Sequence, residues 1–152
     1  MIKKTSQSGR SMVEMLGVIA IIGLITVAGV TSMGYVDSYF RSSATVIEID
    51  NIAKDVIDTY SWSRDFSNLS MDTICDENIL NCTDGSGKNR WGGNITVSVP
   101  EGNANIFTIT YSNVPKIPCE QLLSASDENE FHYVSVQSVD CSDNSTMKFF
   151  LK

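Results

Sequence analysis

Apolar residues form an almost unbroken run near the start of the chain. No charged residue occurs from Met15 to Val36. A helix needs about 20 residues of this kind to cross the hydrocarbon core of a bilayer. We therefore predict a helix that is inserted in a membrane at some stage. The positive-inside rule keeps Lys3 and Lys4 in the cytoplasm and places the residues after Val36 outside.

The pattern then becomes amphipathic. Apolar residues recur every three or four positions with charged residues between them, which is typical of a helix with one buried face. No proline occurs from Met12 to Ser61, so nothing in the chain forces a break. We predict one helix of about 50 residues, roughly 75 Å long, whose outer half packs on the rest of the chain. The recurring positions are Val36, Phe40, Ala44, Ile47, Ile52, Val56, Ile57 and Tyr60.

The rest of the chain favours strands. Residues 94–99 and 105–111 alternate between apolar and polar side chains, with a turn-rich connection that predicts a hairpin. The sequence predicts a second pair of strands at residues 131–138 and 146–151. It also predicts a short helix at residues 117–126, with Pro118 in its first turn. The predicted fold class is α+β, a long amino-terminal helix packed on a four-stranded antiparallel sheet.

One carboxylate, Glu14, stands at the amino end of the apolar run. An ionised carboxylate in hydrocarbon costs roughly 2.5 to 3.5 kcal/mol on insertion scales, so it marks a candidate functional site. The simpler alternative is a charge tolerated at the membrane surface. A cleaved secretory signal would need a small-residue cleavage site, and "TVAGV" is a poor one. A plain signal anchor explains neither Glu14 nor the Gly9–Arg10 junction.

The stretch "GRSMVEMLGVIAIIG", which begins at Gly9, resembles the start of the type IV pilin superfamily. In that family a basic leader ends in glycine, and prepilin peptidase, a membrane-embedded aspartic peptidase, cuts after it. The new terminal amine is methylated and glutamate stands fifth in the mature chain. The resemblance implies a cut between Gly9 and Arg10, which makes Glu14 fifth. Arg10 departs from the family, whose first mature residue is usually apolar.

The resemblance also implies an organisation and a function. The leader would be 1–9, a transmembrane and assembly helix 10–35, the amphipathic half of that helix 36–61, and a pilin head domain 62–152. "RWGGNITV" and "NVPKIPCEQLL" look like segments of type IVb-like major pilins. The implied protein is a structural subunit of a pilus or fimbrium that serves adhesion, aggregation, motility or DNA transfer. A pseudopilin of a type II secretion system shares the same amino-terminal features.

The resemblance further implies the partners and the role of Glu14. Copies would form a homopolymer, held in membrane lipid before inner-membrane machinery assembles them into an extracellular or periplasmic filament. In that filament the carboxylate of Glu14 would meet the terminal amine of Arg10 on a neighbouring copy. Pairing would remove most of the cost of burial only in the correct register.

Four cysteines in an exported domain favour two disulfides, for which three pairings exist. No Cys-x-x-Cys pair is present to suggest zinc. The segment from Cys119 to Cys141 looks like the disulfide-bounded region of pilins, so we expect that pair, together with Cys75 and Cys82.

Charge and composition disfavour several other functions. Residues 62–152 hold six Lys or Arg against twelve Asp or Glu, a balance unsuited to nucleic-acid phosphates. The single histidine, His132, is expected to be a sheet residue, which leaves no other histidine for a catalytic triad. We predict no enzyme, no cofactor and no metal site. Asp72, Asp76, Glu77 and Asp84 lack EF-hand spacing and are expected in a solvated loop.

A eukaryotic signal-anchored glycoprotein is a remote alternative. Four Asn-x-Ser/Thr sequons support it, although a chain rich in Asn, Ser and Thr produces such triplets by chance. That alternative leaves Gly9 and Glu14 unexplained. The sequons begin at Asn68, Asn81, Asn94 and Asn144.

Overall fold

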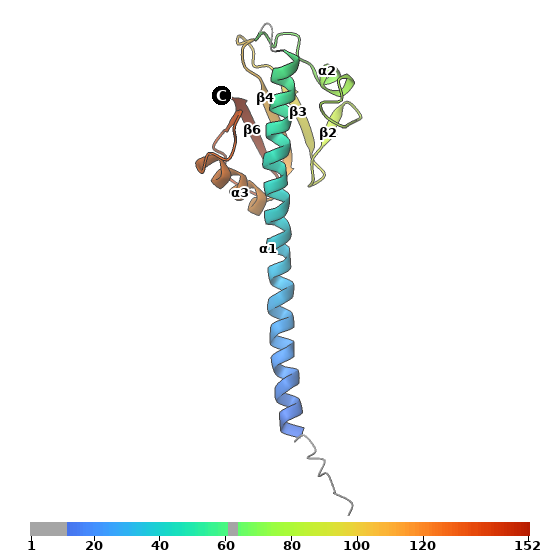
Figure 1. Cartoon of the computed structure of the whole chain (residues 1–152), viewed down its shortest axis with the longest axis vertical. Coiled ribbons are helices and arrows are strands. Elements are labelled where there is room, and N and C mark those ends of the chain that lie inside the picture. Colours follow the sequence, from blue (N-terminus) through green and yellow to red (C-terminus); the bar gives the residue numbers. More distant parts are fainter. Residues whose placement is uncertain (1–11, 61–63) are drawn as a thin grey trace, which may run out of the picture. The chain divides into compact units, whose positions relative to one another are not determined.

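A computed structural model describes residues 12–60 and 64–152. Helix α1 runs from Met12 to Thr59, which confirms the prediction of one long uninterrupted helix (Figure 1). By length and composition its apolar part could cross a membrane. The chain divides into two compact units, residues 1–37 and residues 38–152, which we call the stem unit and the head unit. α1 contributes residues to both units.

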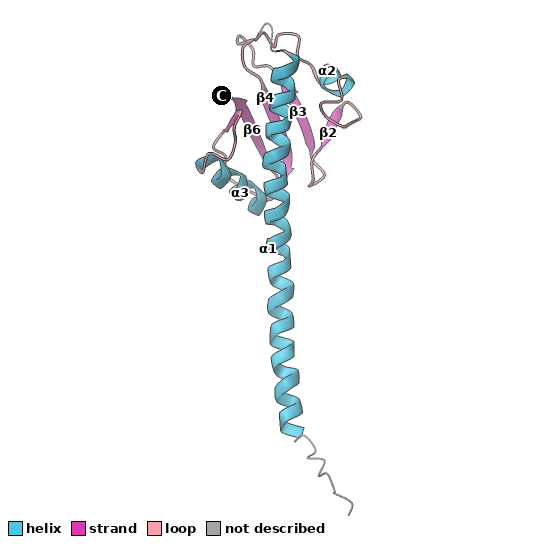
Figure 2. Ribbon diagram, viewed as in Figure 1, coloured by secondary structure: helices cyan, strands magenta, loops and turns pink. Residues whose placement is uncertain are grey.

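The head unit contains an antiparallel sheet, as predicted, but of six strands rather than four (Figure 2). The two additional strands form a short hairpin before the predicted ones. They are two and three residues long, too short to show alternation in the sequence, and the backbone turns between them at Asp84 and Gly85, which both have positive φ. The strands are β1 (Cys82–Thr83), β2 (Ser86–Lys88), β3 (Asn94–Ser98), β4 (Thr108–Val114), β5 (Val134–Val136) and β6 (Ser145–Leu151).

The strands lie in the order β1-β2-β3-β4-β6-β5. The predicted hairpin is the β3–β4 pair, in which Val97 lies opposite Ile109. The second predicted pair is β5 with β6. The two pairs join because β4 also bonds to β6, with Ile109 opposite Phe149.

Two short helices flank the sheet. α2 (Met71–Asp76) is not predicted from the sequence; Ser70 caps it by accepting a hydrogen bond from the backbone N–H of Thr73. α3 (Lys116–Asp127) matches the predicted helix and has Pro118 in its first turn. α2 contacts β2 and β3, whereas α3 contacts β5 and β6. The two helices therefore belong to opposite ends of the strand order, as Figure 1 shows.

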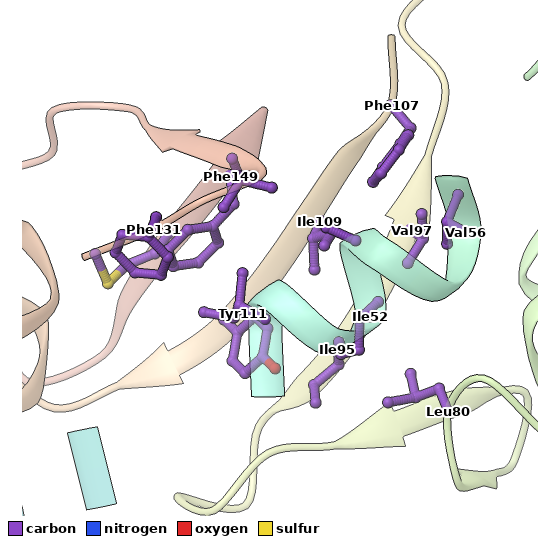
Figure 3. Close-up of a cluster of buried hydrophobic side chains, with 14 of the residues drawn as sticks. Ile52, Val56, Leu80, Ile95, Val97, Phe107, Ile109, Tyr111, Phe131 and Phe149 are labelled. Carbon is purple, nitrogen blue, oxygen red and sulfur yellow. The ribbon is translucent and has the colours of Figure 1, made fainter. Parts of the chain in front are cut away.

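The core of the head unit lies between α1 and the sheet (Figure 3). Ile52 and Val56 of α1 meet side chains of β3 and β4 there, among them Ile95 and Ile109. The predicted stripe on α1 is only partly right. Ile52 and Val56 are buried, but Val36, Phe40 and Ile47 are exposed. The remaining α1 residues of the core are Val46, Ile49 and Ala53.

The expectation that His132 is a sheet residue is wrong. β5 covers only Val134–Val136, and His132 lies in the turn before it with its side chain 79% exposed. The reason is a tertiary contact: the carboxylate of Asp50 on α1 binds the backbone N–H groups of His132 and Tyr133. Those groups are therefore turned toward α1.

Candidate functional site

The described part of the stem unit is a helix with apolar side chains on every side. All of its large apolar residues are exposed, from Met12 at 83% to Val36 at 49%. A helix that is apolar all round is stable in water only when lipid or protein covers it. Glu14 is the acidic residue in its first turn and is also exposed. Gly9 and Arg10 lie outside the described residues.

The described part of the stem unit also carries four glycines at which a side chain would meet open space. A β-carbon added at Gly17, Gly23, Gly29 or Gly34 would meet no atom within 4 Å. Each glycine costs about 1 kcal/mol relative to alanine inside a helix. Among the described residues, no close contact at these positions compensates for this cost.

Within the head unit, α1 has two apolar faces. At 3.6 residues per turn, Phe40, Ala44 and Ile47 fall on one face, opposite the face of Ile49 and Val56 that covers the sheet. Phe40 is 66% exposed and Ile47 is 63% exposed, whereas Ile49 is fully buried. The exposed face thus holds part of the stripe that the sequence pattern assigned to the core, whereas Ile52 and Val56 of the same stripe are buried.

A carboxylate on the side of α1 is only partly neutralised. One oxygen of Glu48 is buried and has no hydrogen-bond donor among the described residues. The nearest charge is Nε of Arg90, 3.7 Å away, which is an ion pair too long for a hydrogen bond. Burial raises the pKa of Glu48, and the charge of Arg90 opposes this increase without cancelling it.

Tyr111 on β4 is a second buried polar group. Its side chain is fully buried in the core, and its hydroxyl has no hydrogen-bond partner among the residues described. Burial raises the pKa of this tyrosine well above its ordinary value, and the negative charge of Glu48 adds to the increase. Tyr111 is therefore neutral at any physiological pH and serves as part of the core.

The connection between β2 and β3 is held by one buried amide. The side chain of Asn89 donates to the carbonyl of Ser112 at 2.6 Å and accepts from the backbone N–H groups of Trp91 and Gly93 at 3.0 and 2.8 Å. Gly93 lies so close to β4 that a β-carbon there would collide with the carbonyl oxygen of Ser112. Residues 89–93 are thereby fixed against the sheet.

Two disulfides fix other segments of the head unit. Cys75 at the end of α2 is joined to Cys82 of β1, and Cys119 of α3 is joined to Cys141. These are the two pairs that we expected, and the resemblance pointed to the second of them. The first joins α2 to the hairpin at one end of the sheet. The second joins α3 to the connection between β5 and β6.

The described residues contain no group of three or more His, Cys, Asp or Glu side chains arranged to hold a metal ion. The structure brings together two pairs that the sequence did not indicate, Glu48 with Arg90 and Asp50 with His132. Each pair joins residues more than 40 positions apart, and no local pattern reports such contacts. Glu14 could be found in the sequence because it is a single charge beside a long apolar run. These four residues lie in segments where charged and apolar residues are mixed, so none of them stands out in this way.

An apolar helix that continues into a head domain and covers an antiparallel sheet defines the class of type IV pilin domains. The comparison with protein families agrees, because residues 40–149 match the family described as PilS N terminal. The chain belongs to that family, whose members are type IV pilin domains and thus structural subunits. A search of curated proteins gives no match. The family match covers most of the head unit and leaves the apolar stem outside.

Proposed function

We propose that this chain is a subunit of a type IV pilus or pilus-like filament and that copies polymerise through the apolar helix. The observation that carries the proposal is the exposure of every large apolar side chain in the described part of the stem unit. Burying such a side chain is worth roughly 1.5 to 3 kcal/mol. That much apolar surface needs a partner, and a pilin family provides a reason for that partner to be another copy.

The proposal has two stages. Before assembly, the helix lies in the inner membrane with the head unit outside, because the apolar run has the length of a bilayer span. Prepilin peptidase cuts after Gly9, and inner-membrane machinery then moves the subunit into an extracellular or periplasmic filament. There the copies replace lipid as the cover of the helix. The leader 1–9, helix 10–35, helix 36–61 and head 62–152 are the functional divisions.

Glu14 has a specific role in this proposal. Its carboxylate pairs with the new terminal amine of Arg10 on a neighbouring copy. An unpaired charge buried in an apolar bundle is strongly unfavourable, whereas a paired one costs much less. Assembly in the wrong register leaves the charge unpaired, so Glu14 selects one axial position of each helix relative to the next.

The exposed second face of α1 in the head unit supports the same proposal. Phe40 and Ile47 place apolar surface on the side of α1 that does not cover the sheet. Tyr39 adds to this surface and packs edge-on against Phe40 with ring centroids 6.3 Å apart. A second copy would bury all three side chains. The surface available for helix packing therefore extends beyond the stem.

Two measurements on the source cells test the proposal. Mass spectrometry of sheared surface protein should give a mature chain that starts at Arg10, and electron microscopy with antibody against residues 62–152 should label surface fibres. A mature start near Val30 would indicate ordinary signal peptidase and contradict the proposal. Correct processing without fibres would favour a pseudopilin.

A further inference from the structure

A groove of about 320 Å³ runs along the side of α1 in the head unit. One wall is α1, and the other is formed by residues that precede β1 and follow β2. The lining contains apolar side chains and charged ones, and more of the charged ones are acidic than basic. Its principal residues are Ile47, Glu48, Asp55, Ile79, Asn81 and Arg90.

The groove lacks a donor for one of its acids. The buried oxygen of Glu48 has no hydrogen bond among the described residues, and Arg90 is 3.7 Å away with 48% of its side chain exposed. The raised pKa of Glu48 reflects the same deficit, since burial is its largest cause. A second cation beside Glu48 would complete the pairing of a half-buried carboxylate, and the walls at Ile47 and Ile79 would cover an aliphatic stem.

The chain itself carries a side chain of this kind. Of the lysines in the head unit, Lys54, Lys88 and Lys152 are already bonded within the chain. Lys148 lies between the buried Met147 and Phe149 on β6, so it points to the sheet face away from α1. The remaining lysine is Lys116.

Lys116 begins α3 and is exposed, and none of the described residues bonds to its ammonium group. The next residue, Ile117, is an exposed large apolar side chain, 46% accessible. A basic and an apolar side chain thus stand together at this end of α3. They match the acidic and apolar composition of the groove.

Resting on the proposed function, we infer that the groove beside Glu48 receives the Lys116–Ile117 pair of a second copy. The ammonium group of Lys116 meets the carboxylate of Glu48, and Ile117 contacts Ile47. The two surfaces are different parts of the same chain, so the contact is heterologous. Heterologous contacts repeat from copy to copy and generate open polymers unless the rotation closes a ring.

The first test reverses the charge of the inserted side chain in the full chain. Lys116→Glu should lower the ratio of sheared filament to cell-held subunit by at least about tenfold, because a like charge then faces Glu48. Glutamate in the first turn of a helix is favourable, so the variant should fold. Lys148→Glu is the matched control, with the same change of charge on the other sheet face, and should assemble normally. Wild-type filament yield from Lys116→Glu would overturn the inference.

The second test detects the contact directly. Filaments that carry both Ile47→Cys and Ile117→Cys should give a ladder of multimers on non-reducing gels, because each copy contributes both thiols. Neither single variant should give a ladder. Absence of a ladder from intact filaments overturns this inference alone. Absence of filaments from the processed wild-type chain overturns the proposed function and, with it, the inference.

Discussion

The carboxylate of Asp50 on α1 holds the turn that contains His132. The backbone N–H of His132 donates to both carboxylate oxygens at 3.2 and 2.9 Å, and Nδ1 of its ring lies 2.9 Å from one of them. The side chain of Asp50 is 13% exposed, whereas that of His132 is 79% exposed. The carboxylate is therefore the shielded partner in this interaction, and the histidine ring is open to solvent.

Replacing Asp50 should weaken the head unit more than replacing its histidine partner. Asp50→Ala removes the charged acceptor of two backbone N–H groups, which should lower the free energy of unfolding by about 2 kcal/mol. His132→Ala removes only a solvent-exposed pair and should change it by less than about 0.5 kcal/mol. Urea unfolding of the detergent-solubilised chain, followed by tryptophan fluorescence, measures both. An equal loss of unfolding free energy in the two variants would show that the ring contact contributes most of this interaction.

Adding one methyl group at Gly93 should be among the most damaging small changes in the head unit. The new β-carbon would collide with the carbonyl oxygen of Ser112, which belongs to a backbone that cannot move freely. We expect a loss of at least about 3 kcal/mol. Gly92→Ala is the control, since φ is +80° there but the space is open, and it should cost only about 1 to 2 kcal/mol. Thermal melting that ranks the two variants in reverse order would contradict the prediction.

The half-buried Glu48 should make the head unit less stable as pH rises. Its pKa is raised in the folded chain from an ordinary value of 4.5, chiefly by burial. The folded state therefore holds this proton more tightly than the unfolded state. Its contribution is fully favourable below pH 4.5 and is lost as pH rises through the raised pKa.

The variant Glu48→Gln isolates this effect. Relative to the wild type, it should gain stability between pH 4 and pH 7, because glutamine has no charge to bury. Comparing the two chains at each pH cancels the contributions of other groups that titrate. If the difference in unfolding free energy between the two chains stays constant over this pH range, Glu48 keeps its ordinary pKa in the folded chain.

Removing the disulfide that closes the longer loop should destabilise the head unit. In the chain-entropy model, the cross-link from Cys119 to Cys141 contributes on the order of 3 kcal/mol, and Cys119 is fully buried. Replacing both cysteines by serine should lower the urea midpoint. Peptide mapping without reductant should recover Cys75 with Cys82 and Cys119 with Cys141. A peptide that joins Cys75 to Cys119 would refute this pairing.

Changing Glu14 should separate membrane insertion from assembly. Glu14→Ala should insert as well as the wild type or slightly better, because a cost of a few kcal/mol disappears. Assembly should fall because, in the filament that we propose, the Arg10 amine of a neighbour loses its partner. Glu14→Gln keeps the shape without the charge and should be nearly as defective. The readout is the ratio of sheared filament to membrane-held subunit, and a wild-type ratio from Glu14→Ala would mean that the charge is incidental.

The longer elements of this fold are predictable because their patterns are local. An uninterrupted helix to Thr59 follows from apolar spacing and the absence of proline, and β3, β4 and β6 follow from alternation. β1 and β2 are too short to alternate, and their pairing depends on a turn with positive φ. α2 is a six-residue helix defined by its Ser70 cap rather than by periodicity.

The face of α1 that covers the sheet is harder to predict for a different reason. The helix carries apolar side chains on two opposite faces in the head unit, so periodicity alone cannot distinguish the face of Phe40 from that of Ile49. Which face is buried depends on the sheet that packs against it, and this sheet is formed by residues far along the chain. The contact of Asp50 with His132 also cannot be read from local pattern, since it joins positions 82 residues apart.

The position of β6 in the sheet has a consequence for synthesis. β6 is last along the chain, yet it lies between β4 and β5, and β5 has no other partner in the sheet. β5 therefore cannot join the sheet until β6 has left the ribosome. Until then the head unit cannot complete its sheet, and the edge of β4 that pairs with β6 stays unpaired.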